Sequence, residues 1–150
     1  DMTRKAGIRI KGLFMLGNFG ETRETIDETL RFIKRVQMDD FQLNCFTPLP
    51  GTPESKLAHK HGKYDPDWKK ANIALPENFI PNGFTYEELL FYRRKAYKAF
   101  YLRPRIIFYY FVKMFRDKRL FVKILRGGMS LLRYVILGNV NLNKHSYRKL

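Results

Sequence analysis

The chain has 150 residues, of which 45% are hydrophobic and 15% aromatic, enough apolar material for one globular domain of ordinary size. It contains 29 Lys and Arg, 14 Asp and Glu and a single cysteine, and its formal net charge is +15. One cysteine excludes a disulfide framework and fits a reducing compartment. No apolar run reaches the roughly 20 residues that a membrane-spanning helix needs. We therefore expect a cytoplasmic protein, with the inner face of the membrane as a candidate contact.

Two strand-like runs flank one helix in the first third of the chain. The first run, Ile8, Ile10 and residues 13–16, predicts a largely buried strand, and the second comprises Phe41, Leu43, Cys45 and Phe46. Between them, Thr22 can cap a helix whose apolar stripe includes Ile26, Leu30 and Ile33. A crossover of this size makes the two strands parallel, so the segment predicts one βαβ unit.

The loops that follow the two strands, residues 17–21 and 47–53, should emerge at the same edge of this sheet. Ligands of parallel sheets bind beyond the carboxyl ends of the strands. Gly17 and Gly20 allow positive φ or a close approach of the backbone to a ligand, and Glu21 can accept hydrogen bonds from loop amides. Taken alone, such glycines more often only turn a strand into a helix, since an isolated G-x-x-G is weak evidence.

Further helices are predicted downstream. Residues 53–61 form a short helix that Gly62 can end, and residues 63–83 form an irregular connection. Thr85 and Glu88 make a capping box for a helix that runs to about Tyr101. Three short helices are expected after it, at residues 104–116, 117–126 and 129–137. The predicted domains are the βαβ segment 1–62, a connecting loop 63–84 and a basic aromatic helical extension 85–150.

The two loops together are more specific than either alone. The phrase LGNFGETRETIDETLRF, followed by FTPLPGTP, resembles the last part of the radical S-adenosylmethionine (radical SAM) barrel, in the branch that often has an upstream cobalamin-binding domain. The segments DPDW and EELLFYRRKAYKAFYLRPR resemble the C-terminal extension of that branch, so the resemblance covers most of the chain. The family usually has proline at the position of Phe19.

The resemblance implies an α/β fold: the C-terminal βαβ portion of a partial (β/α)6 barrel, followed by an α-helical extension. In such enzymes a [4Fe-4S] cluster cleaves S-adenosylmethionine and starts radical chemistry such as methyl transfer, cyclisation or rearrangement. The Cys-x3-Cys-x2-Cys loop that binds the cluster is absent, and Cys45 is expected to be a buried thiol. We therefore expect a C-terminal fragment that starts near the end of the fourth barrel helix. Alone, it would be inactive and would fold poorly for want of sheet neighbours.

The resemblance also implies which residues contact a cofactor. The fifth and sixth strands would bind the adenosine of S-adenosylmethionine through these positions: Met15, Gly17, Gly20, Glu21, Phe46, Thr47 and Pro48. No residue of the chain is assigned as a catalytic group or a metal ligand. A cobalamin domain would lie upstream, and the sequence leaves open whether cobalamin takes part.

The C-terminal segment is strongly basic, with 11 of the 29 Lys and Arg in residues 105–150 against one acidic residue, Asp117. The favoured interpretation is that its aromatic side chains pack on the barrel while the cations stay in water. Contact of residues 104–150 with a membrane surface comes second. Nucleic-acid binding is disfavoured, because no RNA-binding signature is present. The same composition favours a lipophilic small-molecule substrate. The alternative to an enzyme is a non-catalytic basic helical module that binds a membrane surface or an anionic polymer.

Overall fold

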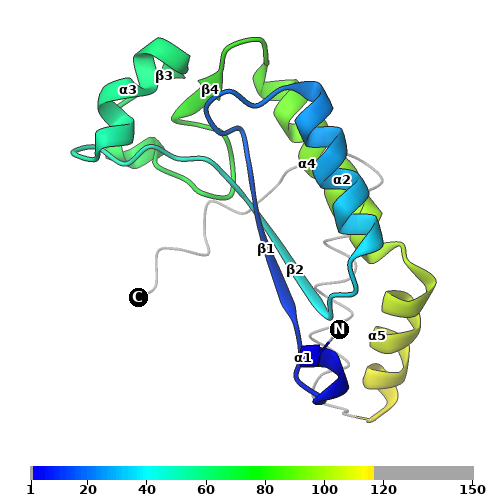
Figure 1. The fold of residues 1–150 in the computed structure, drawn as a ribbon. Helices are drawn as coiled ribbons and strands as arrows, with labels where there is room; N and C mark the ends of the chain where they lie inside the picture. Colours follow the sequence, from blue (N-terminus) through cyan, green and yellow to red (C-terminus); the bar gives the residue numbers. More distant parts are fainter. Residues whose placement is uncertain (1, 117–150) are drawn as a thin grey trace. The chain divides into compact units, whose positions relative to one another are not determined.

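A computed structural model describes residues 2–116 and shows an α/β architecture (Figure 1). In chain order, the elements are α1 (Met2–Lys5), β1 (Lys11–Leu16), α2 (Arg23–Arg35), β2 (Asp40–Cys45), α3 (Pro53–His61), β3 (Gly62–Tyr64), the 3-10 helix η1 (Trp68–Lys70), β4 (Phe79–Pro81), α4 (Tyr86–Tyr101) and α5 (Pro104–Arg116). The first compact unit is Asp1–Arg103, and α5 begins the second. The predicted helices at 117–126 and 129–137 lie outside the described residues, and the predicted three-part domain division stays a prediction.

The predicted βαβ unit is confirmed. β1 and β2 pair in parallel, in a register that runs from Lys11 beside Asp40 to Leu16 beside Cys45. Within residues 2–116 they form a two-stranded sheet, and no closed barrel is present. Helices α2 and α4 lie next to each other along the same side of this sheet (Figure 1).

The two faces of the β1–β2 sheet differ in burial. The helix-covered face consists of Gly12, Phe14, Leu16, Phe41, Leu43 and Cys45. The opposite face, called the open face below, consists of Lys11, Leu13, Met15, Asp40, Gln42 and Asn44. Leu13 is 70% exposed, Met15 53% and Ile8, which precedes the strand, 58%. The expectation of a largely buried first strand is therefore wrong, because the helices cover only one face.

The helices form where the sequence predicts them, and their caps explain why. Thr22 caps α2 with a capping box that Thr25 completes, and Thr85 caps α4 with a capping box that Glu88 completes. The apolar stripe of α2 is confirmed as buried, and α4 buries Leu89, Ala96 and Phe100. The ring of Phe100 stacks on Phe41 of β2 at a centroid distance of 5.2 Å, which joins α4 to the sheet.

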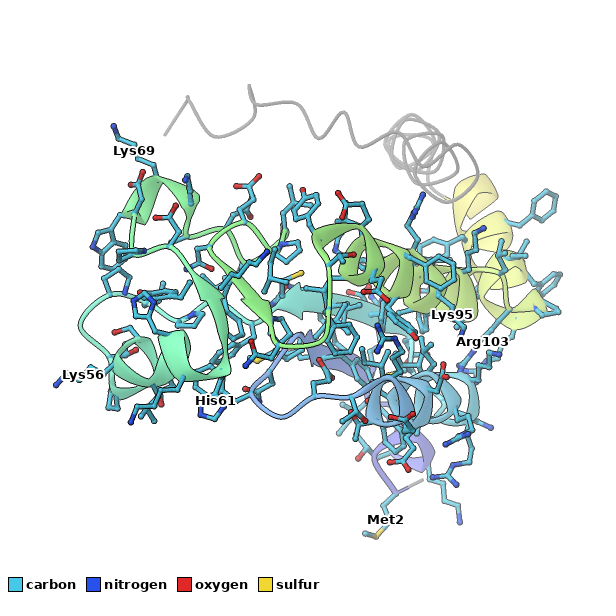
Figure 2. All side chains as sticks on the ribbon, turned by 90° about the horizontal axis from the view of Figure 1, so that it is seen from above. Met2, Lys56, His61, Lys69, Lys95 and Arg103 are labelled. Carbon is cyan, nitrogen blue, oxygen red and sulfur yellow. The ribbon has the colours of Figure 1, made fainter. Side chains whose placement is uncertain are left out.

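Polar contacts also connect α4, and Arg103 just after it, to α2 and its C-terminal end. Lys95 Nζ lies 2.9 Å from Asp27 Oδ1, and Arg103 Nη1 donates to the carbonyl of Val36 at 2.8 Å; Figure 2 labels both basic residues. At the other end of the pair, Arg23 Nη2 lies 2.6 Å from Glu88 Oε1. These ion pairs are exposed, so screening by water leaves each of them only a small contribution to stability. Apolar burial is the main source of the α2–α4 packing.

The segment between α3 and α4 is more regular than predicted. α3 has the expected bounds and ends at Gly62, but β3 and β4 then pair in an antiparallel sheet with Gly62 beside Pro81. A Cβ on Gly62 would clash with the backbone of Ile80 and Pro81, so this pairing requires glycine. The irregular connection predicted over residues 63–83 is therefore wrong for β3 and β4. The strands are only three residues long, and Gly and Pro at their ends are more typical of turns.

Candidate functional site at the carboxyl edge of the parallel strands

The loops after β1 and β2 begin at one edge of the sheet, as predicted. The amide of Phe46 donates to the carbonyl of Leu16 at 2.7 Å, which extends the pairing by one step beyond β2. The first loop then turns through Gly17 with φ 86° and Gly20 with φ 71°. Only glycine takes this left-handed conformation without strain, so both glycines are needed to shape the loop.

Glu21 holds the first loop closed. Its carboxylate accepts a hydrogen bond from the Gly17 amide, and its own amide donates to the carbonyl of Asn18 at 3.2 Å. The predicted role of Glu21 in the turn is thus confirmed. Burial raises the pKa of the Glu21 carboxyl above its ordinary value, while the amides of Gly17 and Asn18 oppose that shift. The geometry makes Glu21 a positioning residue for this loop.

Phe19 fixes the tip of the same loop by packing. Its ring lies 5.0 Å from the ring of Phe46 and 5.4 Å from that of Phe79, both edge to face. It also stacks on His61 at a centroid distance of 4.5 Å; Figure 2 shows His61 at the end of α3. Phe79 is 1% exposed. An aromatic cluster therefore joins the first loop to α3 and β4 at the position where the resembling family usually has proline.

The second loop is held by hydrogen bonds within the framework. The hydroxyl of Thr47 lies within hydrogen-bond distance of the carbonyls of Cys45, at 3.1 Å, and Asn72, at 3.4 Å. Pro48 is buried, and its carbonyl accepts from Asn78 Nδ2 at 3.2 Å. The hydroxyl of Thr47 and the carbonyl of Pro48 thus have partners within the protein.

The structure brings only part of the predicted site together. Gly17 and Glu21 are hydrogen-bonded, but Gly17 is buried beside Pro81 and Leu89. Gly20 is exposed at the loop. Met15 lies within β1, two residues before Gly17, on the open face of the sheet. The proposed adenosine contacts remain a prediction, and Met15 and Gly20 are the most exposed members of the set.

Two polar residues on the open face were not among the predicted site residues. Gln42 Nε2 donates to Asn44 Oδ1 at 3.1 Å, and Asn44 is the register partner of Met15. The signal that could have identified them is the alternation of β2, in which Phe41, Leu43 and Cys45 are buried and the residues between them are not. Amide side chains beside a thioether give the open face both hydrogen-bonding and apolar character.

Cys45 does not belong to this face. Its thiol is buried on the helix-covered side, as expected, and burial raises its pKa to about 11. Such a thiol stays protonated at neutral pH and is a poor nucleophile. Within residues 2–116, no group of three or more His, Cys, Asp or Glu is placed to hold a metal ion.

The described residues form an α/β fold in which the loops after β1 and β2 begin at one edge of the sheet. Sequence comparison relates part of this chain to enzymes. It is 33% identical over 105 residues to an uncharacterised methyltransferase of Pyrococcus horikoshii, covering 69% of this chain and 23% of the relative. It is 33% identical over 109 residues to the bacteriochlorophyllide d C-8(2)-methyltransferase of Chlorobaculum tepidum, with the same shares. It is 30% identical over 108 residues to the anaerobic magnesium-protoporphyrin IX monomethyl ester cyclase of Cereibacter sphaeroides, covering 72% of this chain and 17% of that protein.

The chain thus spans less than a quarter of the length of these curated relatives. No family model and no solved structure matches it. Over part of its length the chain is a distant homologue of methyltransferases and a cyclase, which is consistent with the resemblance to the cobalamin-binding branch of radical SAM enzymes.

Proposed function

We propose that this chain forms the last strands of the barrel of a radical SAM enzyme, and that its open face lines the barrel interior. The observation that supports this best is an asymmetry in how the β1–β2 sheet is covered. One face is packed against α2 and α4, whereas Leu13 and Met15 on the other face are largely exposed. In a (β/α) barrel, helices cover only the outer face of each strand, and the inner face meets the other strands of the barrel.

The two edges of the sheet support the same placement. On the outer side of β2, the amide of Cys45 donates to the carbonyl of Ile73 at 2.7 Å, so the connection after η1 covers the carboxyl end of that edge. Within residues 2–116, no strand pairs with the outer edge of β1. The carboxyl end of the outer edge of β2 is thus covered, whereas the outer edge of β1 has no paired strand within residues 2–116. This arrangement fits the last two strands of a larger sheet.

A groove beside β1 is also consistent with a missing neighbour. It lies against α2 and is lined by Phe14, Glu28, Thr29, Arg31, Phe32 and Arg35. Phe32 is 44% exposed there. In the proposed barrel, a longer helix, of which α1 would be only the last turn, would precede β1, pack into this groove and cover Phe32.

The residues at the carboxyl edge fit an adenosine in part. Adenine needs flat apolar contact and a few amide partners, and Met15, Phe46 and the amides of Gln42 and Asn44 offer both. When bound, the [4Fe-4S] cluster and S-adenosylmethionine supply the radical chemistry, and cobalamin would be held by residues outside this chain. The part of this chain would be to bind and orient the adenosine. Its substrate is then a small molecule, and the relatives named for bacteriochlorophyllide d and for magnesium-protoporphyrin IX monomethyl ester favour a lipophilic one.

The test is a binding measurement on the complete enzyme, prepared without oxygen, with Met15→Asp as the variant. A carboxylate in place of the thioether should weaken S-adenosylmethionine binding at least about tenfold, because it adds charge to an apolar contact. Lys34→Ala, at an exposed position on α2, is the control and should bind as the unmodified enzyme does. Equal affinity of Met15→Asp and the control, with the cluster absorbance intact in both, would contradict the proposal.

A further inference from the structure

Helix α5 exposes a continuous apolar face. Ile107 is 53% exposed, Phe108 67%, Phe111 54% and Val112 37%. These residues form two adjacent pairs four positions apart, and the helical period places them within an arc of about 140°. This set of residues is called the α5 apolar face below. Exposed apolar residues that occur singly are normal on a protein surface, but a contiguous row on one helix marks an interaction surface.

The charged residues in the sequence of α5 are all of one sign. The sequence of α5 contains three basic residues, Arg105, Lys113 and Arg116, and no acidic one. The charge of the segment that follows α5 in the sequence is also predominantly basic. Any partner of the α5 apolar face therefore has to combine an apolar surface with negative charge.

We propose that the α5 apolar face inserts into the interfacial region of an anionic lipid bilayer, with Arg105, which the helical period places next to that face, close to the lipid phosphates. Amphipathic helices with aromatic residues on one side and cations on the other bind membranes in this way. Within residues 2–116, no helix is long and apolar enough to cross a bilayer. Because its exposed apolar residues lie on one side, α5 would lie parallel to the membrane surface. The proposal is independent of the enzymatic function proposed above.

The composition of the face favours lipid over nucleic acid. Both partners offer phosphates to basic side chains, and the ring of Phe108 could stack on a base as well as enter a bilayer. The branched aliphatic side chains of Ile107 and Val112 have no ring to stack. They do gain free energy when they leave water for an acyl environment.

The experiment measures co-flotation of the 150-residue chain with lipid vesicles. One set of vesicles is phosphatidylcholine alone, and the other contains about one third phosphatidylglycerol, since surface charge is the variable that matters. The chain is expected to float with the anionic vesicles and to be released as the salt concentration rises. Circular dichroism of every variant verifies that its helix content is unchanged.

Variants separate the apolar from the electrostatic contribution. Ile107→Ser with Phe108→Ser should lower the partition coefficient at least about tenfold, because two large side chains no longer enter the bilayer. Arg105→Gln with Arg116→Gln, at the two basic positions that the helical period places next to the apolar face, should lower it by about tenfold as well and weaken the salt dependence. Leu57→Ser is the matched control: this leucine is 44% exposed on α3, outside α5, and its replacement should leave binding unchanged.

Three results would overturn the proposal. The first is equal binding to neutral and anionic vesicles, and the second is a loss with Leu57→Ser as large as with the α5 variants. The third is binding of single-stranded RNA by a chain that does not float with anionic vesicles. That result would mean that the basic residues bind nucleic acid and not a membrane.

Discussion

At the scale of single residues, Glu21 controls the shape of the first loop. Replacing Glu21 with alanine removes the acceptor of the Gly17 amide, which is partly buried. We expect Glu21→Ala to lower the free energy of unfolding by about 1–3 kcal/mol. Glu21→Gln keeps a side-chain oxygen in the same place and should cost clearly less. Urea unfolding at pH 7 measures both, and equal losses for the two variants would show that the hydrogen bond to Gly17 is unimportant.

A comparison of the unmodified chain with Glu21→Gln at different pH values tests whether the pKa of Glu21 is raised. Because burial raises its pKa, the native state binds the proton more tightly than the unfolded state does. The unmodified chain should therefore gain stability relative to Glu21→Gln as the pH falls from neutral through the raised pKa, and the gain should be complete below the ordinary value of 4.5. A relative loss over this range would mean that the amides of Gly17 and Asn18 outweigh burial.

The sequence was informative for residues whose role is local. Glu21 lies in the same loop as Gly17, four positions away, so its place in the sequence was enough to predict a hydrogen bond to a loop amide, but not that the amide is that of Gly17. The aromatic cluster of Phe19 joins residues up to 60 positions apart, and nothing in the sequence indicates that His61 and Phe79 lie beside it. Gln42 and Asn44 were visible in the alternation of β2 but do not belong to a familiar motif.

At the scale of elements, the capping box at the start of α4 should be a measurable source of stability. Thr85 Oγ1 accepts from the Glu88 amide at 3.2 Å, and Glu88 Oε2 accepts from the Thr85 amide at 2.9 Å. Thr85→Ala should lower the free energy of unfolding by about 1 kcal/mol, whereas Thr85→Ser keeps the hydroxyl and should lose less than half of that. Denaturant unfolding of both variants is the measurement. A loss with serine as large as with alanine would contradict the role of the hydroxyl.

Element boundaries were predicted well where capping residues mark them. Thr22, Pro53, Gly62, Thr85 and Pro104 each stand at the start or end of a helix in the structure, as the sequence indicates. Burial was predicted less well, since the apolar run of β1 gives no sign that only one of its faces is covered. The short β3–β4 pairing was missed because it depends on contacts across the segment rather than on local propensity.

At the scale of the whole molecule, the central claim is that this sheet completes a larger one. The open face, the open edge of β1 and the exposed ring of Phe32 all become buried if further strands and a helix precede β1. The distant enzymes to which the chain is related are more than four times as long as the matching region, which agrees with such an arrangement.

The most direct test of this claim is to sequence the DNA upstream of the codon for Asp1 in the native locus. The proposal predicts an open reading frame that continues upstream and encodes a Cys-x3-Cys-x2-Cys motif about half a barrel before β1. A preceding α/β domain would add cobalamin binding. A start codon immediately before Asp1, with no such motif in frame, would contradict the enzymatic proposal for this chain and would favour a basic module that binds anionic surfaces.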